Sequence, residues 1–153
     1  MQSALTRRTV VGGLVAIAVA PLSTSAAFAT PETMSDAMRQ ELGPDARPQA
    51  GRIKITLPEL AENANAVSMR IAVDSPMTAQ DHVKDILVFS EKNPVPTVAR
   101  FHLGPRSGQA RVQTNIRLAG SQTITVVARM SDASLWIASA DVIVTQGACF
   151  DGT

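Results

Sequence analysis

Beyond residue 51 the chain alternates between apolar and polar residues with a period of two. In the first such segment, Ile53, Ile55 and Leu57 are separated by polar side chains. Because successive side chains of a β-strand point to opposite faces of a sheet, this alternation predicts strands with one buried face. Turn residues separate seven predicted strands, which cover residues 52–57, 67–73, 86–89, 99–103, 111–118, 124–130 and 136–144.

Seven short strands at this spacing are typical of an antiparallel β-sandwich of the immunoglobulin-like type, so the predicted fold class is all-β. The cysteine pair of antibody domains is absent, because the chain has one cysteine, and the prediction concerns architecture alone. Segment 86–89 is a continuous apolar run, which is typical of a more fully buried strand. The pattern places Ile55, Val73, Val88, Phe101, Ile116, Val126 and Val142 in the core.

A short helix is predicted over residues 30–43, before the strands. Thr30-Pro31-Glu32 is a start sequence with proline just inside the helix, and Gly43-Pro44 ends it. Apolar residues then fall on one helical face, and they are Met34, Ala37, Met38 and Leu42. This face either packs on its own domain or docks on a partner, and the pattern does not decide between the two.

The first 29 residues have the features of an export signal. Arg7 and Arg8 precede an uncharged run that ends in Ala27-Phe28-Ala29, an A-x-A cleavage site. This arrangement is typical of a twin-arginine signal, which exports folded proteins, although a chance arginine pair in an ordinary secretory signal is the alternative. The predicted organisation is therefore a signal over 1–29, a helix and linker over 30–51, a β-sandwich over 52–145 and a C-terminal arm over 146–153.

Charge and composition exclude several classes of partner. Two of the 14 basic residues lie in the signal, which leaves 12 against 13 acidic residues in the exported part. This balance argues against nucleic acid or an anionic membrane as a partner. Aromatic residues make up 3% of the chain, which argues against a surface that stacks sugars or bases.

Metal or hydrolytic chemistry has little support in the sequence. His82 and His102 lie in different segments without a second ligand at helical or strand spacing, and no metal or cofactor is expected. Nucleotide-binding, metalloprotease and serine-hydrolase motifs are missing. Four aspartates lie in or beside predicted turns and receive no catalytic role; they are Asp74, Asp81, Asp85 and Asp132.

Cys149 is the single cysteine of the chain and the best candidate for chemistry. It follows the last predicted strand and is bracketed by Gly147 and Gly152, which give the backbone freedom. An unperturbed thiol has a pKa of about 8.5, and no cation lies close to Cys149 in sequence. The residue therefore resembles an attachment point on which partner enzymes act more than a self-activated nucleophile, and the alternative is a dispensable cysteine.

Several motifs are spread along the chain after the first predicted strand begins. They are Leu57–Asn63, Val73–Met77, Asn93-Pro94 with Phe101-His102, Ile116–Ala119, and Met130–Asp132 before Trp136. Together these motifs resemble the SoxY family, the sulfur-carrier subunit of the bacterial thiosulfate-oxidising Sox system, and the resemblance runs from about Ile53 to Cys149.

The resemblance implies an immunoglobulin-like carrier that is not itself an enzyme. It implies export by the twin-arginine route to the periplasm and pairing with a small subunit, SoxZ. In the family, a Gly-Gly-Cys-Gly-Gly arm presents its cysteine to several sulfur-oxidising enzymes, which load, oxidise and hydrolyse the bound sulfur. Gly147 and Cys149 match this arm, and Cys149 is the implied attachment site.

The arm departs from the family pattern around the cysteine. Ala148, Phe150 and Asp151 stand where the family has glycine. A phenyl ring adds bulk and restricts the backbone, while Asp151 places a negative charge near an anionic conjugate. Two hypotheses follow: a periplasmic covalent sulfur carrier, or a non-catalytic interaction module whose arm no longer carries substrate. A stand-alone thiol enzyme is a remote third.

Overall fold

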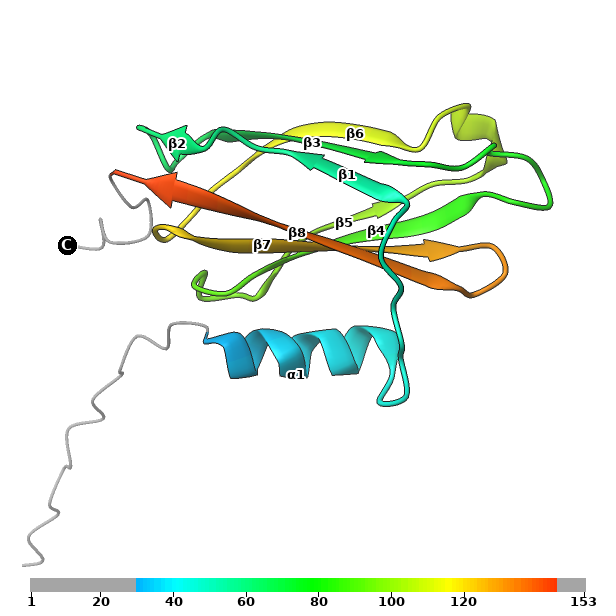
Figure 1. Ribbon diagram of the computed structural model, residues 1–153, viewed down its shortest axis with the longest axis horizontal. Helices are drawn as coiled ribbons and strands as arrows, with labels where there is room; N and C mark the ends of the chain where they lie inside the picture. Colours follow the sequence, from blue (N-terminus) through cyan, green and yellow to red (C-terminus); the bar gives the residue numbers. More distant parts are fainter. Residues whose placement is uncertain (1–29, 146–153) are drawn as a thin grey trace, which may run out of the picture.

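Residues 30–145 are described by a computed structural model, in which two β-sheets and one helix form three layers (Figure 1). The smaller sheet has the strand order β1-β3-β6 and is antiparallel. Its strands are β1 (Ile53–Thr56), β3 (Val67–Val73) and β6 (Arg111–Ile116).

The larger sheet has the order β2-β8-β7-β4-β5 and lies between the smaller sheet and the helix (Figure 1). A short 3-10 helix, Pro105–Ser107, joins β5 to β6. The strands of the larger sheet are β2 (Leu60–Ala61), β4 (Val83–Ser90), β5 (Thr97–His102), β7 (Gln122–Met130) and β8 (Leu135–Val144).

The predicted β-sandwich is confirmed, and each of the seven predicted segments forms a strand. The structure adds an eighth, β2, which pairs in parallel with the end of β8. Two residues are too few to display a period-two pattern. The pairing of β2 depends on where the chain passes β8, and the local sequence does not specify that path.

The core lies between the inner faces of the two sheets. Five of the seven predicted core residues are buried: Val73, Val88, Ile116, Val126 and Val142. The other two, Ile55 and Phe101, are half-buried and pack against this core. Both belong to the edge strands β1 and β5, where a side chain has a neighbouring strand on one side alone.

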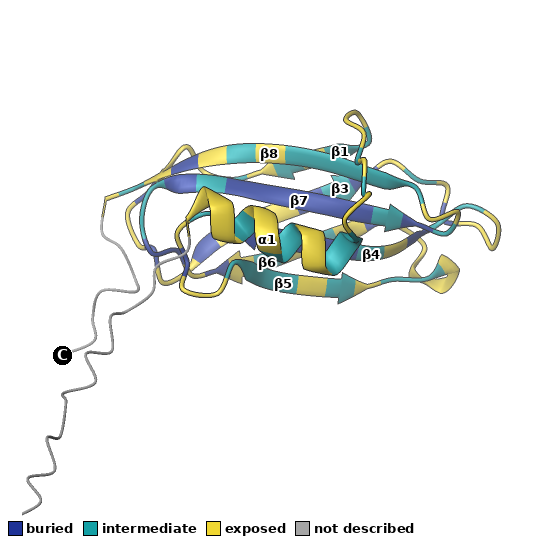
Figure 2. Cartoon of the chain, turned by 90° about the horizontal axis from the view of Figure 1, so that it is seen from below, coloured by how far each residue is buried: buried dark blue, intermediate teal, exposed yellow. Residues whose placement is uncertain are grey.

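Helix α1 (Pro31–Leu42) covers the other face of β4 and β7 (Figure 2). Leu87, Phe89 and Val127 are buried there, and the helix packs Met34, Ala37, Met38 and Leu42 against them. The apolar run 86–89 is explained, because Ile86 and Val88 face the sandwich core while Leu87 and Phe89 face the helix. The apolar helix face therefore packs on its own domain.

Both ends of α1 are capped as the sequence predicts. Thr30 is the N-cap: its Oγ1 accepts a hydrogen bond from Thr33 N at 3.4 Å, and Thr33 Oγ1 accepts one from Thr30 N at 2.6 Å. Gly43 follows the last turn with φ +96°, a conformation that glycine adopts without strain. No helix among residues 30–145 has the length and apolar character needed to cross a membrane.

The core predicts a clear contrast between two aliphatic truncations. Ile86 is 0% exposed, so Ile86→Ala should lower the free energy of unfolding by about 2–5 kcal/mol, because it leaves a cavity. Leu60 is 53% exposed, and Leu60→Ala should change it by less than about 1 kcal/mol. Urea unfolding followed by circular dichroism measures both, and equal losses would contradict this assignment of the core.

Candidate functional site

The sequence-predicted site residue Cys149 lies outside the described residues. The same holds for Gly147 and Gly152 of the arm and for Arg7 and Arg8 of the signal. The described chain reaches Thr145, one residue beyond β8. The structure therefore describes the end of the sandwich next to the predicted arm, up to Thr145.

The base of the arm is held from both sides of β8. On one side, Val144 N donates a hydrogen bond to Ser121 Oγ at 2.8 Å, and Ser121 Oγ donates back to Val144 O at 3.3 Å. On the other side, β2 pairs with the strand end, and Thr145 N donates to Ala61 O at 3.1 Å. The arm thus starts from an anchored point, which we call the arm base and define as Val144, Thr145, Ser121 and Ala61.

A buried polar network fixes the loop that supplies Ser121. Asn93 Nδ2 donates to Arg117 O at 2.7 Å, and Asn93 Oδ1 accepts from Ala119 N at 3.0 Å. Gln122 Oε1 accepts from Ser90 Oγ and from Lys92 N, and Gln122 Nε2 donates to Asn93 Oδ1 at 3.2 Å. Because buried polar groups are costly to leave unpaired, these bonds hold the loop after β6 in one position.

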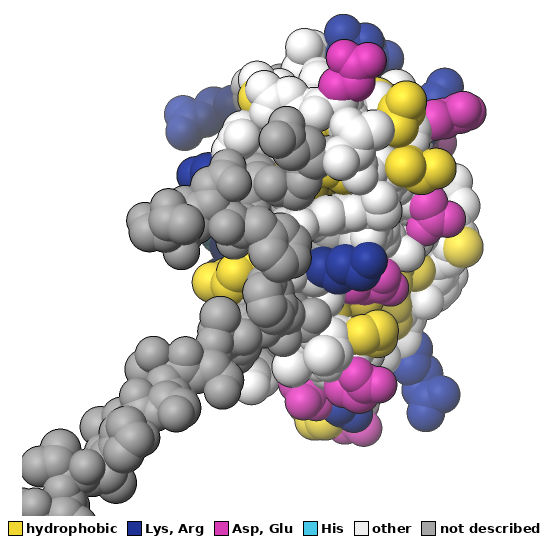
Figure 3. Space-filling view, turned by 90° about the vertical axis from the view of Figure 1, so that its left-hand side faces the viewer, with side chains coloured by type: hydrophobic (Ala, Val, Ile, Leu, Met, Phe, Trp, Pro, Cys, Tyr) yellow, Lys and Arg dark blue, Asp and Glu magenta, His cyan; other side chains and the backbone are white. Residues whose placement is uncertain are grey.

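Apolar side chains are exposed at the same end of the sandwich. Leu60 on β2 and Ile143 on β8 are paired in register and are 53% and 59% exposed, and Val95 in the loop after β4 is 67% exposed. Figure 3 shows this end of the molecule, where apolar side chains lie scattered among charged ones. Exposed apolar residues beside the arm base are suited to contact with another protein.

The two histidines are engaged in hydrogen bonds. His82 Nδ1 lies 3.0 Å from Thr78 O, and His102 Nδ1 lies 2.6 Å from Asp85 Oδ1. Between residues 30 and 145, no group of three or more His, Cys, Asp and Glu side chains is placed to hold a metal ion.

Asp85 belongs to a charged cluster that sequence reasoning missed. The sequence predicted that Asp85 lies in or beside a turn, and this prediction was wrong. Asp85 lies within β4, which begins at Val83. Arg129 Nη1 lies 3.4 Å from Asp85 Oδ2, and Arg129 Nη2 donates to Glu41 O of the helix at 2.8 Å. His102, Asp85 and Arg129 are in register across β5, β4 and β7, which only the pairing of distant strands reveals. The cluster ties the helix to the sheet.

Among residues 30–145, two carboxylates have lowered pKa values, and both serve local structure. A hydrogen bond with Thr30 stabilises the charged form of Glu32 in the first helical turn and lowers the pKa of its carboxyl. Bonds from Ser134 likewise lower the pKa of Asp132, whose Oδ1 accepts from Ser134 N at 2.9 Å in the turn before β8. Neither carboxylate belongs to the arm base.

Comparison with known proteins identifies the fold and the family. The family model described as sulfur oxidation protein SoxY matches residues 38–149. The structure of the sulfur carrier protein SoxY from Chlorobium limicola f thiosulfatophilum matches with 28% identity and a TM-score of 0.62, over 75% of this chain and 98% of that one. No curated protein sequence matches.

Superoxide reductases share the fold at lower identity. A superoxide reductase (neelaredoxin) from Ignicoccus hospitalis matches with 19% identity and a TM-score of 0.55, over 76% of this chain and 94% of that one. A putative superoxide reductase from Thermotoga maritima matches with 23% identity and a TM-score of 0.54, over 65% of this chain and 89% of that one. At these identities the likeness concerns the architecture of the sandwich and not its chemistry.

The arm base predicts a local effect of Ser121→Ala. Removal of the hydroxyl leaves Val144 N without its acceptor, so its amide hydrogen should exchange about tenfold faster, while global stability falls by about 1 kcal/mol. Ser131→Ala is the matched control, because Ser131 Oγ also bridges two backbone groups, His82 N and Gln80 O, in another loop. Amide exchange by NMR would contradict the assignment if both variants changed Val144 equally.

Proposed function

This chain belongs to the SoxY family of sulfur oxidation proteins, and on that premise we propose that it is a periplasmic carrier that holds sulfur intermediates covalently on Cys149. The observation that carries the proposal is the extent of the family match, which runs over residues 38–149 and so includes the single cysteine. The similar protein from Chlorobium limicola is itself a sulfur carrier protein.

The proposed chemistry at Cys149 is the formation of one S–S bond. Joining thiosulfate to the thiol releases one proton and two electrons and leaves an S-thiosulfonate on the cysteine. Those electrons leave through a partner enzyme of the sulfur-oxidising system, and the carrier contributes the thiol and its presentation. We therefore propose that the chain is a substrate-bearing subunit and that the catalytic groups belong to its partners.

The length of the tether restricts how partners reach the thiol. Cys149 follows Thr145 by four residues, and an extended chain spans at most about 3.6 Å per residue, so the two Cα atoms are within about 14 Å of each other. An enzyme that acts on Cys149 must therefore approach the end of the sandwich closely. The exposed Leu60 and Ile143 beside the arm base provide apolar surface for that approach.

The proposed partners and location come from the family resemblance and the N-terminal sequence. We expect a SoxZ-like small subunit, Sox-type enzymes and export through the twin-arginine signal that contains Arg7 and Arg8. The apolar face of helix α1 is occupied, because Met38 and its neighbours pack on the larger sheet. The partner must therefore bind elsewhere on the sandwich.

A second candidate function is favoured by the residues around the cysteine. Ala148, Phe150 and Asp151 replace glycines of the family arm, which makes the arm bulkier and more acidic. In this alternative the sandwich is an interaction module, and Cys149 is spare or forms an intermolecular disulfide. The intact cysteine supports the carrier, and the altered arm supports the module.

Cys149→Ser tests the carrier directly. Protein purified from periplasm during growth on thiosulfate should carry reductant-sensitive adducts on Cys149, in steps of a sulfur atom or a thiosulfonate, and the variant should carry none. Intact mass spectrometry measures the adducts. Stability should change by less than about 0.5 kcal/mol if the side chain lies on the surface.

Phe150→Gly is the companion variant and should accelerate the loading of sulfur onto Cys149 if the bulk of the phenyl ring limits access to the thiol. If the wild-type thiol is unmodified and Cys149→Ser leaves sulfur oxidation unchanged, the interaction module is favoured over the carrier.

The proposed heteromeric partner predicts a second small protein in the native complex. Affinity purification of the folded chain from its own periplasm should recover this protein in a near-equal molar amount, and Cys149→Ser should leave the pair intact, because pairing does not need the thiol. Native mass spectrometry measures the stoichiometry. A clean monomer at physiological concentration would contradict the pairing.

A further inference from the structure

The outward face of the smaller sheet carries charge of one sign. Its charged residues are Lys54 on β1, Arg70 on β3 and Arg111 on β6, and none of these three strands contains an aspartate or glutamate. The exported part of the chain has nearly equal numbers of acidic and basic residues. The basic charge on this face therefore reflects segregation and not an overall excess.

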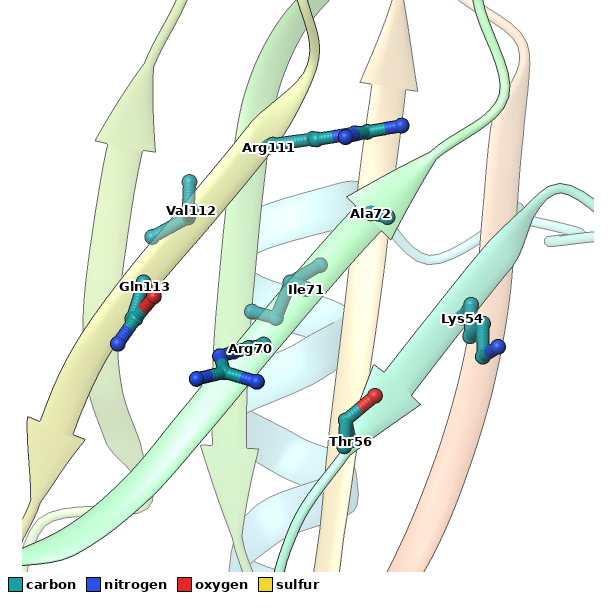
Figure 4. A pocket seen from close by; sticks show the side chains of 8 residues that line it. All are labelled: Lys54, Thr56, Arg70, Ile71, Ala72, Arg111, Val112 and Gln113. Carbon is teal, nitrogen blue, oxygen red and sulfur yellow. The ribbon is translucent and has the colours of Figure 1, made fainter.

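The three cations surround a hollow whose centre is an alanine. Ala72 pairs with Lys54 on one side and with Arg111 on the other, and Arg70 is two residues earlier on the same face of β3. A methyl group at this position leaves a hollow of about 430 Å³, which Thr56 and Gln113 also line. Figure 4 shows Lys54, Arg70 and Arg111 reaching this hollow from three different strands. We call this surface the basic face and define it by those three cations and Ala72.

The charges of the basic face are not neutralised within the described part of the chain. The ion pairs among residues 30–145 involve Arg39, Arg52, Arg100, His102 and Arg129. None of them involves Lys54, Arg70 or Arg111. All three cations of the basic face are exposed. Three like charges gathered in one hollow repel each other and create a positive potential, which an anionic partner relieves.

We propose that the basic face is a docking site for an acidic surface of another protein. Adjacent strands lie about 4.8 Å apart and alternate residues about 7 Å apart, so the cations are spread over a surface roughly 10 Å wide. This spacing suits several carboxylates on one partner, each forming its own ion pair. A single small anion in such an open hollow would compete with water and salt at every contact.

The position of the basic face leaves the arm free. Val67, the first residue of β3, lies at the end of the sandwich that holds the arm base, whereas Ala72 lies toward the opposite end (Figure 1). A protein docked over Ala72 can therefore bind without contacting Thr145. This inference does not depend on Cys149, so it stands or fails independently of the carrier proposal.

The test measures binding of an acidic probe to the full exported chain. A fluorescein-labelled oligoglutamate peptide should bind the wild type in fluorescence anisotropy, and binding should weaken as NaCl rises toward about 0.15 M. The triple variant Lys54→Gln, Arg70→Gln, Arg111→Gln should lose about tenfold in affinity, because three exposed ion pairs are removed together. Its thermal midpoint should not fall below that of the wild type, since all three side chains are exposed and their mutual repulsion is removed.

The matched control removes the same amount of charge elsewhere. Arg47, Lys84 and Lys92 are exposed, and their joint replacement by glutamine should change the affinity by less than about threefold. Cys149→Ser should bind the peptide as the wild type does. Equal losses in the two triple variants, or no binding by the wild type, would overturn the proposal. Displacement of the peptide by sulfate or thiosulfate well below the ionic strength at which NaCl displaces it would overturn it in favour of a small-anion site.

Discussion

Burial of β4 and β7 on both faces is the constraint on which the rest of the structure depends. Their inner side chains, such as Ile86 and Val126, meet the smaller sheet, and their outer ones, such as Leu87 and Val127, meet helix α1. Strands enclosed in this way cannot shift in register by one residue, because every side chain would change its environment. β8 is hydrogen-bonded to β7 from Leu135 to Val142, so the position of the arm base follows from this central pair.

Local patterns in the sequence predicted most of the fold. Period-two alternation identified the strands, the run at 86–89 identified a strand with two buried faces, and the caps Thr30 and Gly43 bounded the helix. Features that depend on the pairing of distant segments could not be predicted. Asp85 joins His102 and Arg129 only through the register of three strands, and Ser121 reaches Val144 across 23 residues of sequence. The candidate thiol was identifiable from the sequence because it belongs to the single cysteine. The hydrogen bonds that hold the arm base were visible only in three dimensions.

The molecule presents two surfaces of different character to its surroundings. The end of the sandwich around the arm base has apolar residues, Leu60 and Ile143, whereas the outer face of the smaller sheet is basic around Ala72. Apolar contacts give affinity with little dependence on salt, and charged contacts mainly steer association and weaken as salt rises. A carrier that exchanges partners at one end while keeping another on its side would use these two properties separately.

The direction in which β8 meets its neighbours also determines how the domain resists force. The hydrogen bonds of a sheet run perpendicular to its strands, so a pull along β8 through Thr145 loads the β7–β8 ladder in shear. Under shear, many of these bonds share the load and must fail together, whereas a sideways pull would open them one at a time. The parallel strand β2 closes the other side of the strand end and opposes such peeling. An enzyme that draws the arm along the axis of β8 therefore works against the mechanically strongest direction of the sandwich.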